Sequence, residues 1–117
     1  LDLPIVRGFV GRDVENGRAA NAARAALAAR VLSAFSRREV AESVSEIDVS
    51  DPNGASVILK GDTALIKLGR EDFLERLQSY LELAPALRVQ VPEIDYVDLR
   101  FDRRVYVRAV DARESER

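Results

Sequence analysis

The chain of 117 residues contains no cysteine, histidine, methionine or tryptophan. The absence of cysteine excludes disulfides, thiolate nucleophiles and thiolate metal ligands. The absence of histidine removes the side chain that most often acts as a general acid or base near neutral pH, together with imidazole metal sites. Serine and threonine are present, but no histidine can activate them as nucleophiles. The common catalytic constellations are therefore missing, and we expect no catalytic, cofactor-binding or metal site.

Long apolar runs are missing as well. No stretch approaches the roughly 20 apolar residues that a membrane helix needs, and the chain does not open with a signal-peptide pattern. The length suits a single hydrophobic core, and a hydrophobic share of 47% with a charged share of 32% is typical of a globular domain. Because the chain starts at Leu1 rather than methionine, we expect an excised or processed piece, which leaves room for an anchor or targeting segment upstream.

Charge is distributed unevenly along the chain. The formal net charge of −2 argues against broad nucleic-acid binding. By segment, the net charge is +3 over residues 1–40, −7 over residues 41–99 and +2 over residues 100–117. The C-terminal end is therefore basic within an acidic half, which bears on the kind of partner it could meet.

Two helices are predicted, over residues 16–35 and 69–87. The first segment is rich in alanine, the strongest helix former. Its apolar face at helical spacing consists of Ala23, Leu27, Val31 and Ala34. The second has an apolar stripe and acids in its first turn, and Pro85 is expected to mark its end.

Strand patterns occupy much of the remaining chain, after an extended entry segment over residues 1–13. Residues 43–69 alternate between apolar and polar side chains, interrupted by turn signals, which predicts three antiparallel strands. Residues 94–109 predict two more strands, with Val97, Leu99 and Phe101 on the buried side of the first.

The predicted fold is therefore of the α+β class. We expect an antiparallel sheet of about five strands, a meander plus a C-terminal hairpin, with two main helices packed on it. The domain should cover residues 1–110, and we expect residues 111–117 to form a polar, disordered tail.

Two acidic segments have features of ligand or catalytic sites, but neither fits such a site. Glu93, Asp95 and Asp98 could in principle supply paired carboxylates, but on a strand the third points away from the other two. Residues 48–54 have the acidic start of a calcium loop, but residue 59 is leucine where that loop needs its later glutamate. Turn chemistry explains the second segment fully.

The basic C-terminal hairpin leaves three interpretations open. Arginines that alternate with aromatic residues are typical of single-stranded nucleic-acid binding, although two aromatics are a weak signal. Charges on a terminal strand also protect an edge from unwanted pairing. The same geometry suits an edge that is left open for a partner strand.

The order of these segments resembles the C-terminal part of the FtsQ/DivIB bacterial cell-division proteins. The resemblance rests on "LPIVRG" (3–8), "ALIKLGREDFLERLQSYLELAPAL" (64–87), and "YVDLRF" (96–101) followed after a turn by "VYVRA" (105–109). It implies the β domain of a single-pass membrane protein, which follows a short cytoplasmic tail, one membrane helix and a POTRA domain. The implied location is the extracytoplasmic, periplasmic side of the inner membrane, with membrane contact only through the absent upstream helix.

The resemblance implies a scaffold, not an enzyme, that takes part in septum formation and in the control of septal peptidoglycan synthesis. Its partners would be FtsB and FtsL, and FtsB would add a strand beside the last strand of the sheet. No nucleic acid would be a partner. The implied partner-binding residues are Arg100, Phe101, Arg103, Arg104, Val105, Tyr106, Val107, Arg108, Leu83 and Leu87. In that set, Arg100 would pair with an acid of the partner, and Leu83 and Leu87 would line an apolar groove.

Two features differ from the family pattern and leave an alternative open. The family turn usually contains glycine, whereas this chain has Asp102-Arg103-Arg104, which leaves open the turn type and a shift of the register by one residue. Tyr106 and Arg108 replace residues that are commonly small. The alternative function is an extracytoplasmic interaction module of a secretion or outer-membrane assembly system.

Overall fold

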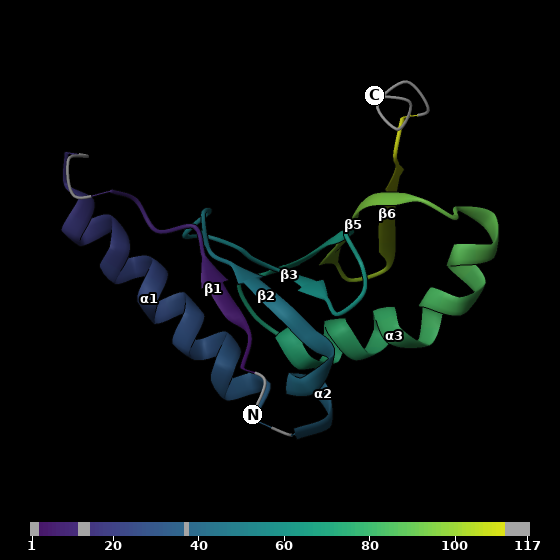
Figure 1. Cartoon of the computed structure of the whole chain (residues 1–117), viewed down its shortest axis with the longest axis horizontal. Coiled ribbons are helices and arrows are strands. Elements are labelled where there is room, and N and C mark those ends of the chain that lie inside the picture. The colour runs from purple at the N-terminus through teal and green to yellow at the C-terminus, as the bar shows by residue number, and fades with distance from the viewer. Residues whose placement is uncertain (1–2, 12–14, 37, 112–117) are drawn as a thin grey trace.

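The computed structural model describes residues 3–11, 15–36 and 38–111, so the expected tail beyond Asp111 lies outside the described residues. Within these residues nine elements follow one another (Figure 1): β1 (Ile5–Arg7), α1 (Gly17–Ala34), α2 (Arg38–Ser43), β2 (Val44–Asp48), β3 (Ala55–Leu59), β4 (Leu65–Gly69), α3 (Phe73–Gln90), β5 (Ile94–Phe101) and β6 (Arg104–Ala109). Among these residues no helix is long and apolar enough to cross a membrane.

The strands form one mixed sheet in the order β1-β2-β3-β4-β5-β6. The α+β class is confirmed, but the expected antiparallel sheet of about five strands is wrong in both number and direction. β1 runs parallel to β2, and β4 runs parallel to β5, while the other neighbours are antiparallel. The physical reason lies in the connection, because α3 carries the chain back along the sheet between β4 and β5, as parallel neighbours require.

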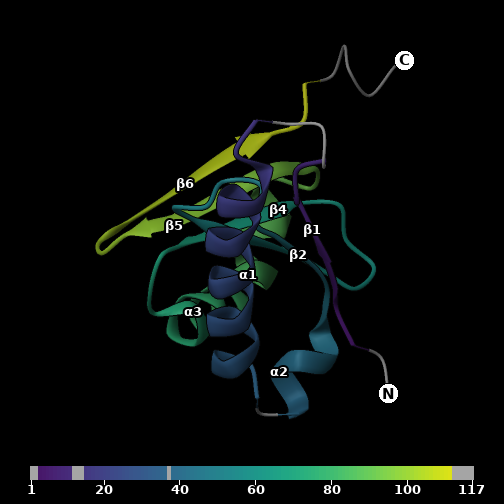
Figure 2. The ribbon, with the colours of Figure 1, turned by 90° about the vertical axis from the view of Figure 1, so that its left-hand side faces the viewer.

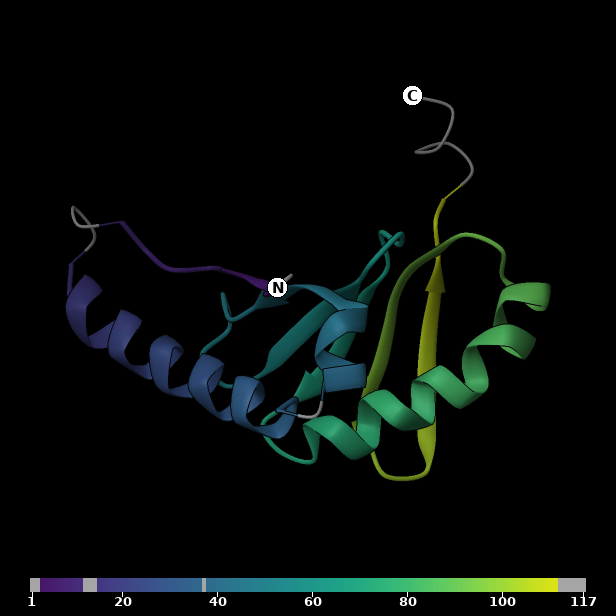
Figure 3. The same cartoon turned by 60° about the horizontal axis from the view of Figure 1, so that its bottom comes forward.

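The hydrophobic core lies between one face of the sheet and the helices. Val57, Ile66 and Val97 point from three adjacent strands into this layer and are fully buried. From the helices, Val31 and Leu77 are also fully buried. Figure 3 shows the helices on one side of the sheet, so in the part of the chain that the structure describes the opposite face carries no helix.

Helix α1 agrees closely with its prediction. Alanine favours the helix, and Leu27 and Val31 at helical spacing are buried against the sheet. Ala23, however, is exposed rather than part of the packed face. Near the start of the helix, Asn21 exchanges two hydrogen bonds with the backbone of Val10, of 2.8 and 3.0 Å. This contact ties α1 to the segment after β1.

Helix α3 does not end at Pro85, so that prediction is wrong. The helix continues to Gln90 with the proline inside it. Proline removes one helical hydrogen bond and its ring clashes with the preceding turn, and together these effects cost about 3 kcal/mol in a helix interior. The turns beyond it are held by tertiary contacts: Leu87 packs on the core, and Arg88 binds Asp62 in the β3–β4 turn with an N–O distance of 2.5 Å.

Two short elements have no counterpart in the sequence analysis. β1 lies in the predicted extended entry and adds a three-residue edge strand next to β2. After β1, Gly8 adopts φ 109° where a Cβ would lie 2.3 Å from the backbone nitrogen of Ser50, so only glycine fits there. α2 is a six-residue helix between α1 and β2.

Candidate protein-docking edge

Strand β6 lies at one edge of the sheet, and β1 lies at the other (Figures 1 and 2). Only β5 pairs with β6 among the described residues, so the outer side of β6 has no strand beside it. Five of the six residues of β6 are exposed, and the sixth, Val107, is half-buried against the core. The predicted last strand therefore exists, with the bounds and the edge position that strand addition requires.

The register shows which backbone groups β6 leaves free. Just beyond its end, Val110 donates its N–H to the carbonyl oxygen of Glu93 at 3.1 Å. Bonded and non-bonded positions alternate along an antiparallel strand. Residues 104, 106 and 108 therefore direct their N–H and C=O groups toward β5. Val105, Val107 and Ala109 direct theirs away from the sheet.

The side chains of β6 divide between the two faces of the sheet. Val107 pairs with the buried Val97 and lies on the helix-covered face. Tyr106 and Arg108 pair with Asp98 and Tyr96 and lie on the face without helices. A partner strand would thus meet small apolar side chains on one face and arginine with tyrosine on the other.

The turn before β6 has no residue with positive φ, so it is not one of the hairpin turns that glycine favours. Phe101 pairs directly with Arg104, which leaves a turn of two residues, Asp102 and Arg103. Two irregularities accommodate the pairing, and both insert the extra residue into β5. β6 itself is therefore regular, whereas a bulged edge strand would accept a partner less readily.

The second irregularity also corrects the predicted position of Phe101. Because it falls between Asp98 and Phe101, the alternation of side chains breaks there. Leu99 is buried as expected, but Phe101 is 50% exposed. Its ring meets Tyr106 edge-on, with centroids 5.2 Å apart. Phe101 is thus a surface residue of the hairpin rather than a core residue.

Arg100 is held in place by residues of its own chain. Its Nε and one terminal nitrogen donate to the two carboxylate oxygens of Asp98, at 2.8 and 2.6 Å. The hydrogen bond from Arg100 is the main reason that the pKa of Asp98 lies below its ordinary value. Gly69, with φ 83°, leaves the space beside it that the Arg100 side chain occupies. Pairing of Arg100 with an acid of a partner stays a prediction.

A cavity of about 470 Å³ lies between the start of α3 and the β5–β6 hairpin. It brings together four of the predicted partner-binding residues, Phe101, Arg103, Arg104 and Val105. Leu83 and Leu87 do not line it, because they lie farther along α3. Leu83 is exposed, whereas Leu87 packs partly on the core. The predicted set is therefore split between the hairpin and the distal half of α3.

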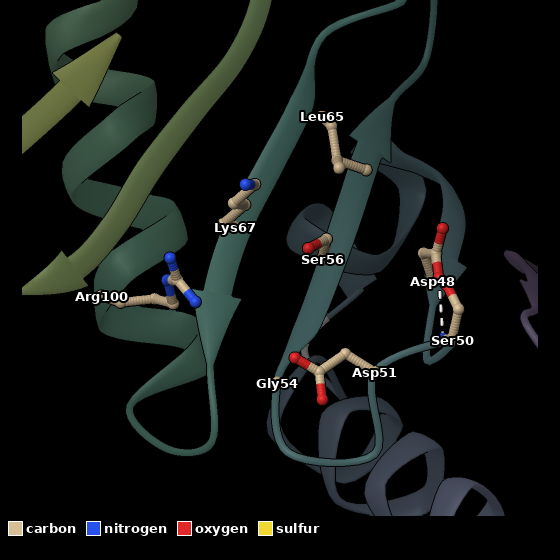
Figure 4. A pocket seen from close by; sticks show the side chains of 8 residues that line it. All are labelled: Asp48, Ser50, Asp51, Gly54, Ser56, Leu65, Lys67 and Arg100. Atoms are coloured by element: carbon tan, nitrogen blue, oxygen red, sulfur yellow. Dashed lines mark hydrogen bonds between the residues drawn. The ribbon is translucent and has the colours of Figure 1, made fainter.

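A second hollow, of about 200 Å³, lies on the helix-free face of the sheet (Figure 4). Arg100 and Lys67 line one side, and Asp48 and Asp51 lie on the other. The sequence analysis did not connect these residues. Ser56 is the hydroxyl in its centre, and nothing there can act as an imidazole base. Within the described ranges no group of three His, Cys, Asp or Glu residues could hold a metal ion.

The comparisons with known proteins point to one family. Residues 1–100 match the family model described as "Cell division protein FtsQ/DivIB, C-terminal". A cell division protein FtsQ of Syntrophotalea carbinolica is 26% identical over 116 residues, which cover 97% of this chain and 41% of that protein. The cell division protein FtsQ of Koribacter versatilis is 38% identical over 66 residues, covering 55% of this chain and 19% of that protein.

The chain thus spans less than half the length of these curated relatives. The match of the family model ends at Arg100, and the relative from Syntrophotalea carbinolica extends the similarity over nearly the whole chain. Together they confirm the resemblance that the sequence motifs indicated. The chain belongs to the FtsQ/DivIB family of cell division proteins, through the C-terminal domain of that family.

Proposed function

We propose that this chain is a non-enzymatic scaffold domain of the bacterial divisome that recruits FtsB, together with FtsL, by accepting a strand of FtsB along β6. In this role it contributes to the control of septal peptidoglycan synthesis. It would act on the periplasmic side of the inner membrane as part of a membrane-anchored protein. The family membership supports the cell-division role, and the properties of β6 support the mode of binding.

The observation that carries the proposal is the unpaired outer side of β6. The N–H and C=O groups of Val105, Val107 and Ala109 point away from β5, and a partner strand would satisfy them. Backbone pairing gives affinity with little demand on sequence, and alternate side chains then add specificity. Arg104, Tyr106 and Arg108 lie on one face of the new pair, and arginine and tyrosine are enriched at binding hot spots.

The first prediction follows from the direction of the Val107 N–H. Val107→Pro removes a donor that serves no bond to β5, so the fold should persist while the partner loses a central hydrogen bond and meets the proline ring. We expect affinity for a synthetic extracytoplasmic FtsB peptide from the same genome to fall at least tenfold, measured by calorimetry. Each net hydrogen bond is worth about 1 kcal/mol, and steric exclusion adds to that loss.

The matched control is Val107→Ala, which shortens the same side chain but keeps the N–H. It should bind within a few fold of the unsubstituted protein. Circular dichroism and thermal unfolding establish that both variants are folded. Normal binding by folded Val107→Pro would rule out β6 as the docking edge.

A further inference from the structure

The bulge near the end of β5 leaves one backbone donor without its ladder partner. Asp98 pairs with Tyr106, and Phe101 pairs with Arg104, so three steps along β5 oppose two steps along β6. A continuous ladder would have bonded the N–H of Arg100 to β6. Instead, this N–H donates to Oδ1 of Asp98 at 3.0 Å. The same carboxylate binds the Arg100 guanidinium, and Asp98 is only 5% exposed.

The alternative registers are both unfavourable for this sequence. A longer turn of three residues would demand positive φ, which the turn residues here, unlike glycine, adopt only at a cost. A slip of β6 by one residue would remove the bulge. It would place Arg108 opposite Val97 on the core face and turn every β6 side chain over. The bulge therefore allows the turn to do without glycine while Val107 stays on the core face of the sheet.

We propose that Asp98 is a positioning residue, whose carboxylate accepts the N–H that the bulge frees and so fixes the register of β6 against β5. That register decides which residues of β6 offer their backbone to the outside and which face carries the arginines. Its consequence for partner binding rests on the proposed function, whereas the register itself does not. Nothing in the turn sequence alone reveals this role, because it depends on where β5 bulges.

Disulfide trapping can read the register, because the chain has no cysteine of its own. Val97 and Val107 form a non-hydrogen-bonded pair, whose Cα atoms lie about 4.5 Å apart in antiparallel sheets, within the range that a disulfide bridges. We expect the double variant Val97→Cys/Val107→Cys to crosslink efficiently on oxidation. The pair Val97→Cys/Arg108→Cys reports the slipped register and should crosslink poorly.

Adding Asp98→Ala to each pair tests the inference. We expect the yield of the first crosslink to fall severalfold and that of the second to rise. Asp98→Asn keeps a side-chain oxygen that can accept the backbone N–H of Arg100. Arg100→Ala keeps Asp98 and the backbone N–H of residue 100 but removes the ion pair. Both of these variants should retain the native crosslink, which separates the backbone hydrogen bond from the salt bridge.

The outcomes decide the inference one way or the other. Unchanged crosslinking in folded Asp98→Ala overturns it, and so does a slip in Asp98→Asn or Arg100→Ala. If Asp98→Ala does not fold, the last two variants decide alone. Trapping uses the free protein, so its failure leaves the docking proposal standing, and normal binding by Val107→Pro leaves the register intact.

Discussion

At the scale of single residues, Gly69 has two separate reasons to be glycine. Its φ of 83° disfavours any other residue, and a Cβ there would lie 2.8 Å from a terminal nitrogen of Arg76 and 3.1 Å from Cγ of Arg100. Arg76 in turn donates to the carbonyl oxygen of Leu68 at 2.5 Å. A methyl group at Gly69 would therefore displace both arginines at the junction of β4, α3 and β5.

Gly69→Ala should lower the free energy of unfolding by about 2–3 kcal/mol, since backbone strain alone costs about 1–2 kcal/mol. Gly61 is the matched control, because its φ is 75° and a Cβ there meets nothing within 4 Å. Gly61→Ala should lower the free energy of unfolding by the backbone strain alone, about 1 kcal/mol. Urea denaturation of both variants gives the comparison. Equal losses would mean that the arginine contacts at Gly69 contribute nothing.

At the scale of elements, α3 depends on an ion pair for its last turns. Beyond Pro85, Arg88 binds Asp62 and the hydroxyl of Tyr80 and also donates to the carbonyl oxygen of Pro92 at 3.2 Å. Burial raises the pKa of Asp62, but hydrogen bonds from Ala64, Thr63 and Arg88 outweigh it and hold the pKa below its ordinary value of 3.8.

This lowered pKa predicts how stability changes with acid. The folded protein binds the Asp62 proton less readily than the unfolded chain, so the stabilisation is present above pH 3.8 and is lost as the pH falls through the lower folded value. Arg88→Gln should therefore reduce stability at pH 6 and flatten its decline between pH 4 and pH 2. Urea unfolding across that range measures this, with Glu82→Gln, an exposed position on the same helix, as the control. An equally steep decline in Arg88→Gln would contradict the assignment.

The elements that the sequence predicted well are those whose reasons are local. Alanine content places α1, and alternation with turn residues places β2, β3 and β4. The errors come from long-range contacts: Ile5–Arg7 becomes a strand only because β2 lies beside it, and α3 passes Pro85 because Arg88 reaches a distant turn. The parallel pairing of β4 with β5 could have been predicted from the sequence, since a helix of 18 residues between two strands is the connection that parallel neighbours use.

The candidate site shows the same division between local and distant causes. The last strand and its arginines are evident in the sequence, and β6 matches that prediction. The roles of Gly69 and Asp98 around Arg100 require the register, because both depend on where β5 bulges and how β4 lies beside it. No spacing rule in one sequence reports a bulge.

At the scale of the whole molecule, a sheet whose edge strands β1 and β6 have no outer neighbour among the described residues must avoid pairing with other copies. The edge at β6 is regular, so two molecules could join by antiparallel pairing of their Val107 residues, and charge is the remaining obstacle. Arg104 and Arg108 are exposed there, and Nε of Arg108 lies 3.6 Å from a carboxylate oxygen of Asp95. Such arginines repel a second copy yet leave an acidic partner strand free to bind.

The double variant Arg104→Ser/Arg108→Ser should therefore self-associate where the unsubstituted domain stays monomeric, as sedimentation over a concentration series would measure. Adding Val107→Pro should restore the monomer, because it removes the central hydrogen bond of the pairing without touching charge. Exposed Arg18 and Arg70, which lie away from β6, supply the matched control: Arg18→Ser/Arg70→Ser removes the same charge and should stay monomeric. If Arg104→Ser/Arg108→Ser stays monomeric, twist or side-chain bulk rather than charge protects the edge. If Arg18→Ser/Arg70→Ser self-associates as well, the cause is a lower net repulsion between molecules rather than strand pairing.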